Sequence, residues 1–530
     1  MQMSIARASL IMIVTLVASR VLGWLRLSVI GAQFGADSRE LDAFWAAFRI
    51  PDTIFNLLVA GALASAFIPV FAGYLAKDSE REAWRVASSF LNALLIALIA
   101  FSGLMWLLAP VFVPLMVGGG DGAGFTQRQQ DLMVELTRIM LLSPIFMGLS
   151  SLFTGILQSY RQFLSGATAP LVYNAVIILF AVFASPFLGI YALAWGVVAG
   201  ALMMWLVQIP ELTFRRTRYS LSFGLGHPGV REIIRLAIPR SLGLLAVQVV
   251  LVVDTALAAR MAPGSLNALI FAFQLLLLPL GVFSIAISAA IFPTLSRYAS
   301  LGQEFRMRQA LQQGIRWILF LTVPTAIVMV VLRRPIVHLL FQYGEFGPAQ
   351  REAVAAAFLM YSLGLVGHAL VQIVSRAYYA MKDTQTPLAL TLVSIGVNVV
   401  LAVLLAPALG INGLALANAI ATLAEAFLLF ALLASRARLR LVGIGVSSLK
   451  VLSASLAMGI AMFLFIRATN VTVDLDQTKL GLLLQTLVAT GVGGVVYLAA
   501  SRLFGITELD EIIAAVRARL ARPSPPPGPD

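Results

Sequence analysis

The sequence predicts an all-α membrane protein that crosses the bilayer many times. Of its 530 residues, 60% are hydrophobic and only 12% are charged, and the mean hydropathy is +0.94. Soluble domains carry about twice that charged fraction. Apolar runs of about 20 residues, long enough to span the hydrocarbon core as a helix, recur along the whole chain. Cysteine is absent, which excludes a disulfide framework and any thiolate metal site or nucleophile.

About fourteen of these apolar runs are long enough to span. The first lacks a small-residue cleavage site and is interpreted as a retained helix rather than a signal peptide. Prolines within or near the runs predict kinks or broken turns, which are tolerated where the backbone lines a cavity. These prolines are Pro51, Pro69, Pro239, Pro279 and Pro293. The expected helices lie near residues 8–33, 41–74, 84–116, 130–158, 165–185, 189–212, 231–258, 267–296, 309–333, 351–380, 386–407, 411–435, 447–467 and 480–504.

The positive charge of the chain follows the predicted topology. The formal net charge is +13, and with the N-terminus placed in the cytoplasm the two sets of loops hold eighteen and eight Lys or Arg residues. Because cytoplasmic loops are enriched in these residues, the bias predicts that both termini are cytoplasmic. It also explains the net charge without nucleic acid binding. The tail from Thr507 ends in the Pro-rich ARPSPPPGPD, which is predicted to be disordered.

The chain also repeats itself with an offset of about 220 residues. The matching segments are SYRQ at 159–162 with AMKD at 380–383, GIYALAWG at 189–196 with GINGLALA at 410–417, and LDAFWAAFR at 41–49 with LNALIFAFQ at 266–274. Because each copy holds six helices, the repeat predicts two six-helix lobes of the same orientation, as in transporters that bind substrate between their halves. The predicted parts are an N-terminal lobe (1–222), a C-terminal lobe (223–440), helices 13 and 14 (441–506) and a cytoplasmic tail (507–530).

Charged residues gather inside the first two predicted helices. Arg20, Arg26, Asp42 and Arg49 lie within otherwise apolar surroundings. An ionised side chain at membrane depth costs roughly 3 kcal/mol and normally faces a protein interior or a water-filled cavity. Three arginines from two adjacent helices therefore indicate a cationic cavity, and such a cavity favours an anionic passenger.

The geometry of these arginines leaves two interpretations open. Arg20 and Arg26 are six residues apart, about 120° around a helix, so they can line one broad wall at different depths without stacking. The alternative is that the arginines snorkel or form structural ion pairs. No GxxxxGK[ST] phosphate loop is present, so a membrane potential or a cation gradient is the expected source of energy.

Several motifs in order along the chain resemble those of the MurJ/MviN family. They are SRVLGWLR, DAFWAAFRIP, the SYRQ-type loop, LFQYGEF at 340–346 and YYAMKDTQTP at 378–387. Members of this family are bacterial lipid II flippases of the multidrug/oligosaccharidyl-lipid/polysaccharide exporter superfamily. The resemblance implies a multi-pass protein of the bacterial cytoplasmic membrane with a central cavity between two lobes. It also implies that helices 13 and 14 form a groove for the polyprenyl tail of the substrate.

The resemblance implies substrate-binding roles for residues that match the family's motifs. Its two first-helix arginines match Arg20 and Arg26, preceded by Ser19, and its second-helix acidic and basic residues match Asp42 and Arg49. The arginines would grip the pyrophosphate through paired charge-assisted hydrogen bonds, while Asp42 would hold an arginine or reach the sugar or peptide. The chain departs from the common pattern at three positions. These are Leu27, where many members have an acidic residue, and Phe55 and Gln274, where many have an arginine.

Two further expectations concern cations. Arg240, in the IPRSLG entry to predicted helix 7, is expected either to replace a missing cavity cation or to snorkel. Some members hold sodium between helices 7, 11 and 12, and the oxygens at the matching places here belong to Asp254, Ser394, Asn398 and Thr422. Hydrogen bonds between packed helices are the alternative interpretation of these four residues. For Glu425 and His368 we expect packing or cavity lining, with a proton relay as the alternative.

The sequence thus predicts a lipid II flippase that works by alternating access and is not an enzyme. It would carry the undecaprenyl-pyrophosphate-linked peptidoglycan precursor to the outer leaflet, with no cofactor beyond sodium. Anionic membrane lipids and cell-wall synthesis proteins are the other expected partners. The alternatives are a flippase for another polyprenyl-pyrophosphate glycan, a drug or cation antiporter, and a non-transporting scaffold. The extra helix pair disfavours the first alternative, and the arginines disfavour the second.

Overall fold

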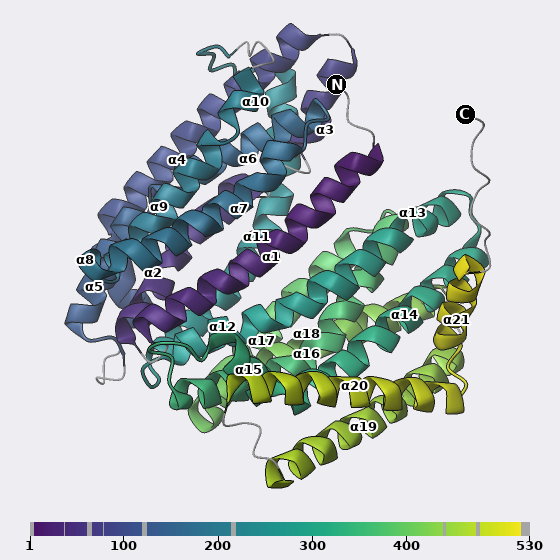
Figure 1. The fold of residues 1–530 in the computed structure, drawn as a ribbon. Helices are drawn as coiled ribbons and strands as arrows, with labels where there is room; N and C mark the ends of the chain where they lie inside the picture. The colour runs from purple at the N-terminus through teal and green to yellow at the C-terminus, as the bar shows by residue number, and fades with distance from the viewer. Residues whose placement is uncertain are drawn as a thin grey trace, which may run out of the picture. The chain divides into compact units, whose positions relative to one another are not determined.

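In the computed structural model of the chain, most of the described residues are helical and none forms a strand (Figure 1). The structure describes residues 5–35, 38–60, 66–77, 79–118, 124–213, 219–437, 441–472 and 478–520. Within the described residues, each of the fourteen ranges in which the sequence predicts a helix is mainly helical. By length and composition, twelve described helices can cross a membrane, or thirteen when one bent pair is counted. The all-α membrane fold is therefore confirmed, whereas fourteen crossings remain a prediction.

The chain forms two compact units. The first comprises Met1–Phe271, Phe341–Ala353 and Ala406–Ile411, and the second comprises Ala272–Leu340, Val354–Leu405 and Asn412–Asp530.

The first unit packs long apolar helices around a core of aromatic and small side chains. Helix α1 lies on α7, α7 on α9, α2 on α5, and α6 on α9, while α11 packs against α4 and η1. In its core, the rings of Phe67 and Phe71 stack with centroids 5.4 Å apart. Its elements are α1 (Ile5–Phe34), α2 (Arg39–Phe55), η1 (Asn56–Ala60), α3 (Ile68–Ala76), α4 (Glu80–Val117), α5 (Gln127–Met140), α6 (Ser143–Ser159), α7 (Leu164–Leu179), η3 (Phe180–Ala184), α8 (Ser185–Leu188), α9 (Tyr191–Leu206), α10 (Ile209–Thr213), α11 (Pro228–Ala259) and the start of α12 (Ser265–Pro279).

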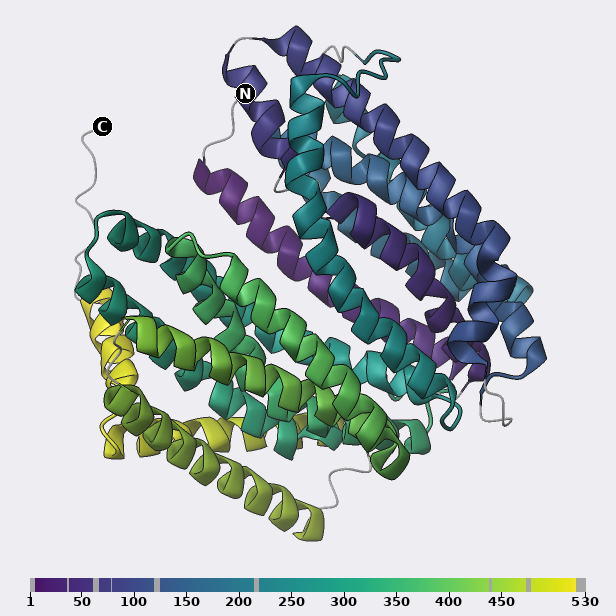
Figure 2. The same ribbon diagram turned by 180° about the vertical axis from the view of Figure 1, so that it is seen from behind.

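Near its C-terminal end, the second unit has a helix pair, α19 and α20, that packs against its other helices. Helix α19 lies against both α14 and α20, and the two views show this pair in yellow-green (Figure 1, Figure 2). The helices approach closely at Gly493, where a Cβ would lie 2.6 Å from side-chain atoms of Met462. The elements after α12 are η4 (Leu280–Ile285), α13 (Ala286–Ser300), α14 (Glu304–Val331), α15 (Arg333–Phe341), α16 (Pro348–Ala380), α17 (Gln385–Leu409), α18 (Ile411–Ala437), α19 (Leu441–Thr472), α20 (Lys479–Leu503) and α21 (Thr507–Leu520).

Three of the prolines expected to break helices lie beside irregular backbone. Pro279 directly precedes the π-helical turn η4, and Pro51 lies one turn before η1. A proline removes one backbone hydrogen bond and crowds the preceding carbonyl, and a π turn accommodates such a fault. Around Pro239, the arms Pro228–Ile238 and Gly243–Ala259 of α11 bend by 42°.

The sequence repeat recurs in the backbone. Arg161 and Lys382, which are 221 residues apart, are the two described non-glycine residues with positive φ, at 60° and 62°. Each follows a helix end of the same form: the N–H of Gln162 donates to the carbonyl of Leu157, and that of Asp383 to Tyr378. These bonds are those of a Schellman motif, which ends a helix with one left-handed residue. The two copies therefore share a backbone design and not only a sequence pattern.

The start of the predicted tail is a packed helix. Thr507–Leu520 form helix α21, in which Leu509 is 6% exposed and packs into a core with Phe320 and Tyr497. The carboxylate of Glu511 accepts a hydrogen bond of 3.1 Å from Nε1 of Trp317 on α14. The apolar positions of TELDEIIAAVRARL follow a helical period, so one face can be buried. The Pro-rich end beyond this helix lies outside the described residues.

Candidate functional site

The buried charges of the first unit converge on one polar cluster, which we call the arginine cluster. It comprises Arg26 on α1, Arg49 and Asp52 on α2, Tyr173 on α7, and Gln248 and Asp254 on α11. Two of the three predicted arginines are therefore brought together, from adjacent helices. Asp52, Tyr173 and Gln248 are members that the sequence analysis did not identify.

Arg26 lies against an aromatic ring. Its guanidinium carbon is 5.9 Å from the centroid of the Tyr173 ring, a distance at which a cation is attracted to the face of the ring. The side chain is partly buried, and its Nε has no hydrogen-bond partner among the described residues. A guanidinium that keeps a donor unused can still bind an anion.

Arg49 and Asp52 belong to the same face of α2, because they are three residues apart on a helix. Opposite charges so placed attract each other, and Asp52 also accepts a hydrogen bond of 3.4 Å from Nε2 of Gln248 on α11. Asp52 follows Arg49 in the segment RIPD and lies inside an apolar run. The rule that identified the arginines could therefore have found it, whereas Tyr173 and Gln248 carry no comparable signal.

Asp254 completes the arginine cluster from α11. It interacts electrostatically with Arg49, and its Oδ1 has no hydrogen-bond partner among the described residues. Two arginines thus face two carboxylates. The cluster is closer to neutral than the cationic cavity predicted from the arginines alone, because sequence reasoning overlooked Asp52 and assigned Asp254 to sodium.

Ser19 and Arg20 lie on α1, about two turns before Arg26, and both are partly buried. Within the described part of the chain, no hydrogen bond or ion pair uses the guanidinium of Arg20. Arg240 is exposed on α11. Binding of substrate by these three residues remains a prediction.

The carboxylate of Asp42 holds a backbone turn. It is 1% exposed, and its oxygens accept hydrogen bonds from the N–H groups of Gly264, at 2.8 Å, and Asn267, at 3.0 Å. These groups lie at the start of α12, where unpaired N–H groups and the helix dipole favour an anion. The sequence analysis predicted that Asp42 holds an arginine or reaches the sugar or peptide. In the structure, both oxygens of its carboxylate already accept hydrogen bonds from backbone N–H groups. Nearby, Arg39 donates a hydrogen bond of 2.6 Å to the carbonyl of Met261.

The other predicted oxygens belong to the second unit. Ser394 donates a hydrogen bond of 3.1 Å to the carbonyl of Ala421, while the buried Asn398 leaves its Oδ1 without a hydrogen-bond partner among the described residues. Thr422 is also buried, and Glu425 accepts a hydrogen bond of 2.6 Å from Thr391. The second unit also contains Gln274, which is partly buried.

These contacts of the second unit are those of packed helices. Thr391 and Glu425 join α17 to α18, and His368 on α16 hydrogen-bonds Asn418 on α18 at 3.1 Å. This agrees with the packing roles expected for Glu425 and His368. Across the described ranges, no group of three or more His, Cys, Asp or Glu side chains is arranged to hold a metal ion.

Fold and site together define a class: a multi-pass transporter with an internal repeat and charged groups buried at membrane depth. The structure is similar to that of an inward-facing MATE-family multidrug transporter of the MOP superfamily, with a TM-score of 0.66 and 16% identity over 81% of this chain and 98% of that one. It is also similar to a structure of lipid II flippase MurJ in an inward closed conformation, with a TM-score of 0.77 and 24% identity over 93% and 98% of the two chains.

Sequence comparison identifies the family. The family model described as "Lipid II flippase MurJ" matches residues 30–482. Lipid II flippase MurJ of Burkholderia cenocepacia is 30% identical over 78% of this chain and 80% of its own length, and the probable lipid II flippase MurJ of Bdellovibrio bacteriovorus is 32% identical over 78% and 79%. The chain belongs to the MurJ family of lipid II flippases. It is accordingly a multi-pass inner-membrane transport protein and not an enzyme.

Proposed function

We propose that this protein moves lipid II from the cytoplasmic to the outer leaflet by alternating access, and that the arginine cluster binds the pyrophosphate of the lipid. The observation that carries the proposal is the convergence of Arg26 and Arg49, from two helices, on one polar cluster inside an apolar unit. Family membership supports the identity of the passenger.

In this proposal the pyrophosphate takes the place of the carboxylates. Without substrate, Asp52 and Asp254 balance part of the charge of Arg49. A pyrophosphate offers more acceptor oxygens than a carboxylate, and a guanidinium can donate two parallel hydrogen bonds to it. The carboxylates then lose their partner, so the occupied and empty states differ in their electrostatics. Such a difference in binding energy is what allows a ligand to shift a conformational equilibrium.

The C-terminal helix pair suits the proposed handling of the lipid tail. Helices α19 and α20 present large exposed apolar side chains, which include Leu456, Phe463 and Leu484. Exposed apolar groups on membrane helices face acyl chains, so a polyprenyl tail can lie along them while the headgroup crosses. The bias in loop charge supports cytoplasmic termini in this scheme.

Sodium coupling through Asp254 is part of the proposal. The supporting observation is the Oδ1 of Asp254 in the first unit, which has no hydrogen-bond partner among the described residues, since sodium prefers oxygen ligands. Replacing Asp254 with Ala should abolish any dependence of transport on sodium. An unchanged response to sodium in a flipping assay would contradict sodium coupling through Asp254.

The proposed function is tested by complementation. The chain is expressed in a bacterium depleted of its own lipid II flippase, and growth is compared for wild type, Arg26→Ala and Arg49→Ala. We expect rescue by wild type and none by either variant, because each removes a phosphate-binding fork at membrane depth. Arg26→Lys and Arg49→Lys are the matched controls, which keep charge but lose the fork and should rescue partially. Rescue by both alanine variants at wild-type membrane levels would contradict the proposal.

A further inference from the structure

A second charged site lies in the second unit, away from the residues of the arginine cluster. A pocket of about 930 Å³ opens where α13 and α18 end, where α14 begins and where α16 turns into α17. This volume falls within the roughly 300–1,000 Å³ typical of small-molecule sites. The charged side chains that line it are Arg297, Glu304, Arg308, Lys382, Asp383 and Arg436.

The pocket carries an excess of positive charge. Four of its charged residues form two ion pairs, Arg308 with Glu304 at 2.7 Å and Arg436 with Asp383 at 2.8 Å. Arg297 and Lys382 have no ion-pair partner among the described residues, so the lining has two uncompensated cations. Arg308 contributes a further donor, because its Nε is buried without a hydrogen-bond partner in the described part of the chain.

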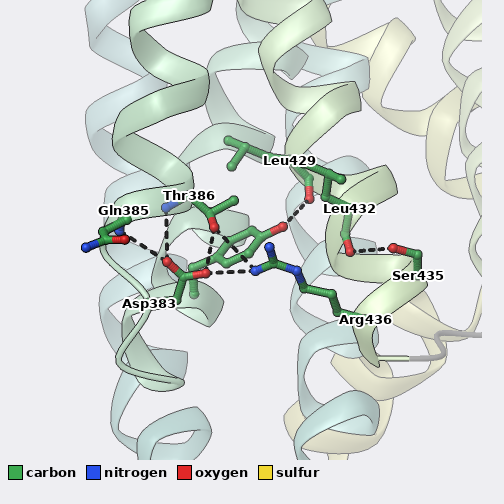
Figure 3. Close-up of polar contacts among 8 residues, drawn as sticks. Asp383, Gln385, Thr386, Leu429, Leu432, Ser435 and Arg436 are labelled. Atoms are coloured by element: carbon green, nitrogen blue, oxygen red, sulfur yellow. Dashed lines mark hydrogen bonds and ion pairs between the residues drawn. The ribbon is translucent and has the colours of Figure 1, made fainter.

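Hydrogen bonds hold the rim of the pocket in place (Figure 3). Asp383 accepts hydrogen bonds from the hydroxyl of Thr386, at 2.6 Å, and from the N–H groups of Thr386 and Gln385, at 3.0 and 3.1 Å. The bonds from Thr386 come first among the causes that lower the pKa of Asp383, and the pair with Arg436 adds to them. Asp383 thereby caps α17 and positions the guanidinium of Arg436 toward the pocket.

The corresponding place in the first unit holds aromatic side chains in place of the basic ones. Helices α4 and α14 begin at Glu80 and Glu304, so Trp84 stands four residues into α4 where Arg308 stands in α14. Nε1 of Trp84 donates to the hydroxyl of Tyr160, at 3.0 Å, which in turn donates to Glu80, at 2.8 Å. Aromatic side chains therefore occupy this corner of the first copy. Because the first copy has the same fold but aromatic side chains at this place, the repeated fold alone does not explain the basic pocket of the second copy.

We propose that this pocket binds a phosphate-bearing anion. Arg297 and Lys382 supply uncompensated charge, and Arg308 and Arg436 supply additional donors from guanidinium groups already oriented by carboxylates. Phosphate is the anion that such forked donors match best. The lining also includes apolar parts of Tyr298, Met307 and Met381, which suit an organic group attached to the phosphate. The ligand is thus a phosphate ester, from an anionic phospholipid headgroup or from solution.

Binding experiments on the full chain in a nonionic detergent test this site. The probes are phosphatidylglycerol, phosphatidylcholine, glycerol 3-phosphate and inorganic phosphate, measured by native mass spectrometry and thermal shift. The double variant Arg297→Gln/Lys382→Gln removes both uncompensated charges. Arg306→Gln is the control, because it removes an exposed arginine from the same helix as Arg308 but outside the pocket lining. Arg26→Gln/Arg49→Gln separates this site from the arginine cluster.

We expect the pocket double variant to bind the preferred probe about tenfold or more weakly, since two charge-assisted contacts are lost, and the control to stay within about twofold of wild type. Phosphatidylglycerol binding that the pocket variant loses, with phosphatidylcholine binding unchanged, supports the lipid source. Loss of binding to glycerol 3-phosphate or inorganic phosphate supports the soluble source. If the pocket variant binds each of the four probes as tightly as wild type does, the proposal is overturned. Because the readout is binding and not transport, failure of this site leaves the proposed function untouched.

Discussion

Helices α2 and α12 hold equivalent places in the two copies of the repeat, yet only one of them is charged. LDAFWAAFR in α2 aligns with LNALIFAFQ in α12, so Asp42 corresponds to Asn267 and Arg49 to Gln274. Within this segment, each charged residue of α2 is matched by a neutral amide in α12. Both helices continue into a π turn, but only α2 contains charged side chains. This difference is one reason why we propose that the first unit binds the passenger's headgroup.

The strongest way to break this contrast is to make α2 resemble α12. Arg49→Gln should reduce flipping of lipid II to background in proteoliposomes, because a neutral amide cannot replace a charged fork. Adding Gln274→Arg, which restores the number of arginines in the other copy, should not recover activity. The control is Gln274→Arg alone, for which we expect near-wild-type transport. Full recovery in the double variant would show that only total charge matters.

The second prediction concerns the pair Asp42 and Asn267. Asp42→Ala leaves two buried N–H groups of the α12 start without their acceptor, which should cost about 1–3 kcal/mol for each group left unsatisfied. Asp42→Asn keeps one acceptor oxygen and should lose less. The loss is measured as a lower midpoint of thermal unfolding in detergent. Equal midpoints for wild type and Asp42→Ala would mean that the carboxylate does not hold this turn.

The third prediction concerns a difference between the two units at the C-terminal end of the chain. The second unit contains an additional helix, α21, which lies outside the repeat. Leu509→Ala should destabilise the protein by about 2 kcal/mol or more, because it opens a cavity in a packed core. Ile512→Ala, on the exposed side of the same helix, should change stability by less than about 0.5 kcal/mol. Similar unfolding midpoints for these two variants would contradict the packing of α21.

The smallest effect is expected at the turns that follow Arg161 and Lys382. Asp383 has a lowered pKa, whereas the first copy has Gln162 in its place. A lowered pKa means that Asp383 adds stability above its unfolded value near 3.8, and that this contribution is lost as the pH falls through the folded pKa. Asp383→Asn should therefore lower the unfolding midpoint more at pH 6 than at pH 3. An equal change at the two pH values would contradict this role of Asp383.

Much of the fold follows from the sequence because hydropathy and periodicity act over whole helices. The fourteen predicted ranges and the 221-residue offset depend on many residues each, so single deviations do not hide them. The sequence analysis assigned no helix to the start of the tail, because the helical pattern of α21 is short and weak compared with the membrane spans. A weak local pattern is stabilised here by tertiary contacts with Trp317 and the adjacent core.

The site was less predictable, for physical reasons that particular residues illustrate. Ionisable residues in apolar runs are visible in sequence, so Arg26 and Arg49 were found, and Asp52 meets the same criterion. Asp42 meets it too, but its task depends on the turn at Gly264, more than 200 residues away. Tyr173 and Gln248 are ordinary residues for membrane helices, and their part in the arginine cluster arises only from the packing of α7 and α11.

The most direct test of the central claim is the affinity of the full chain for its lipid. Binding of lipid II and of a polyprenol without the pyrophosphate is titrated by native mass spectrometry, for wild type and for Arg26→Gln/Arg49→Gln. The arginine cluster predicts that the variant binds lipid II at least about tenfold more weakly while binding the phosphate-free polyprenol equally well. Unchanged lipid II affinity in the variant would contradict the claim that these buried arginines grip the pyrophosphate.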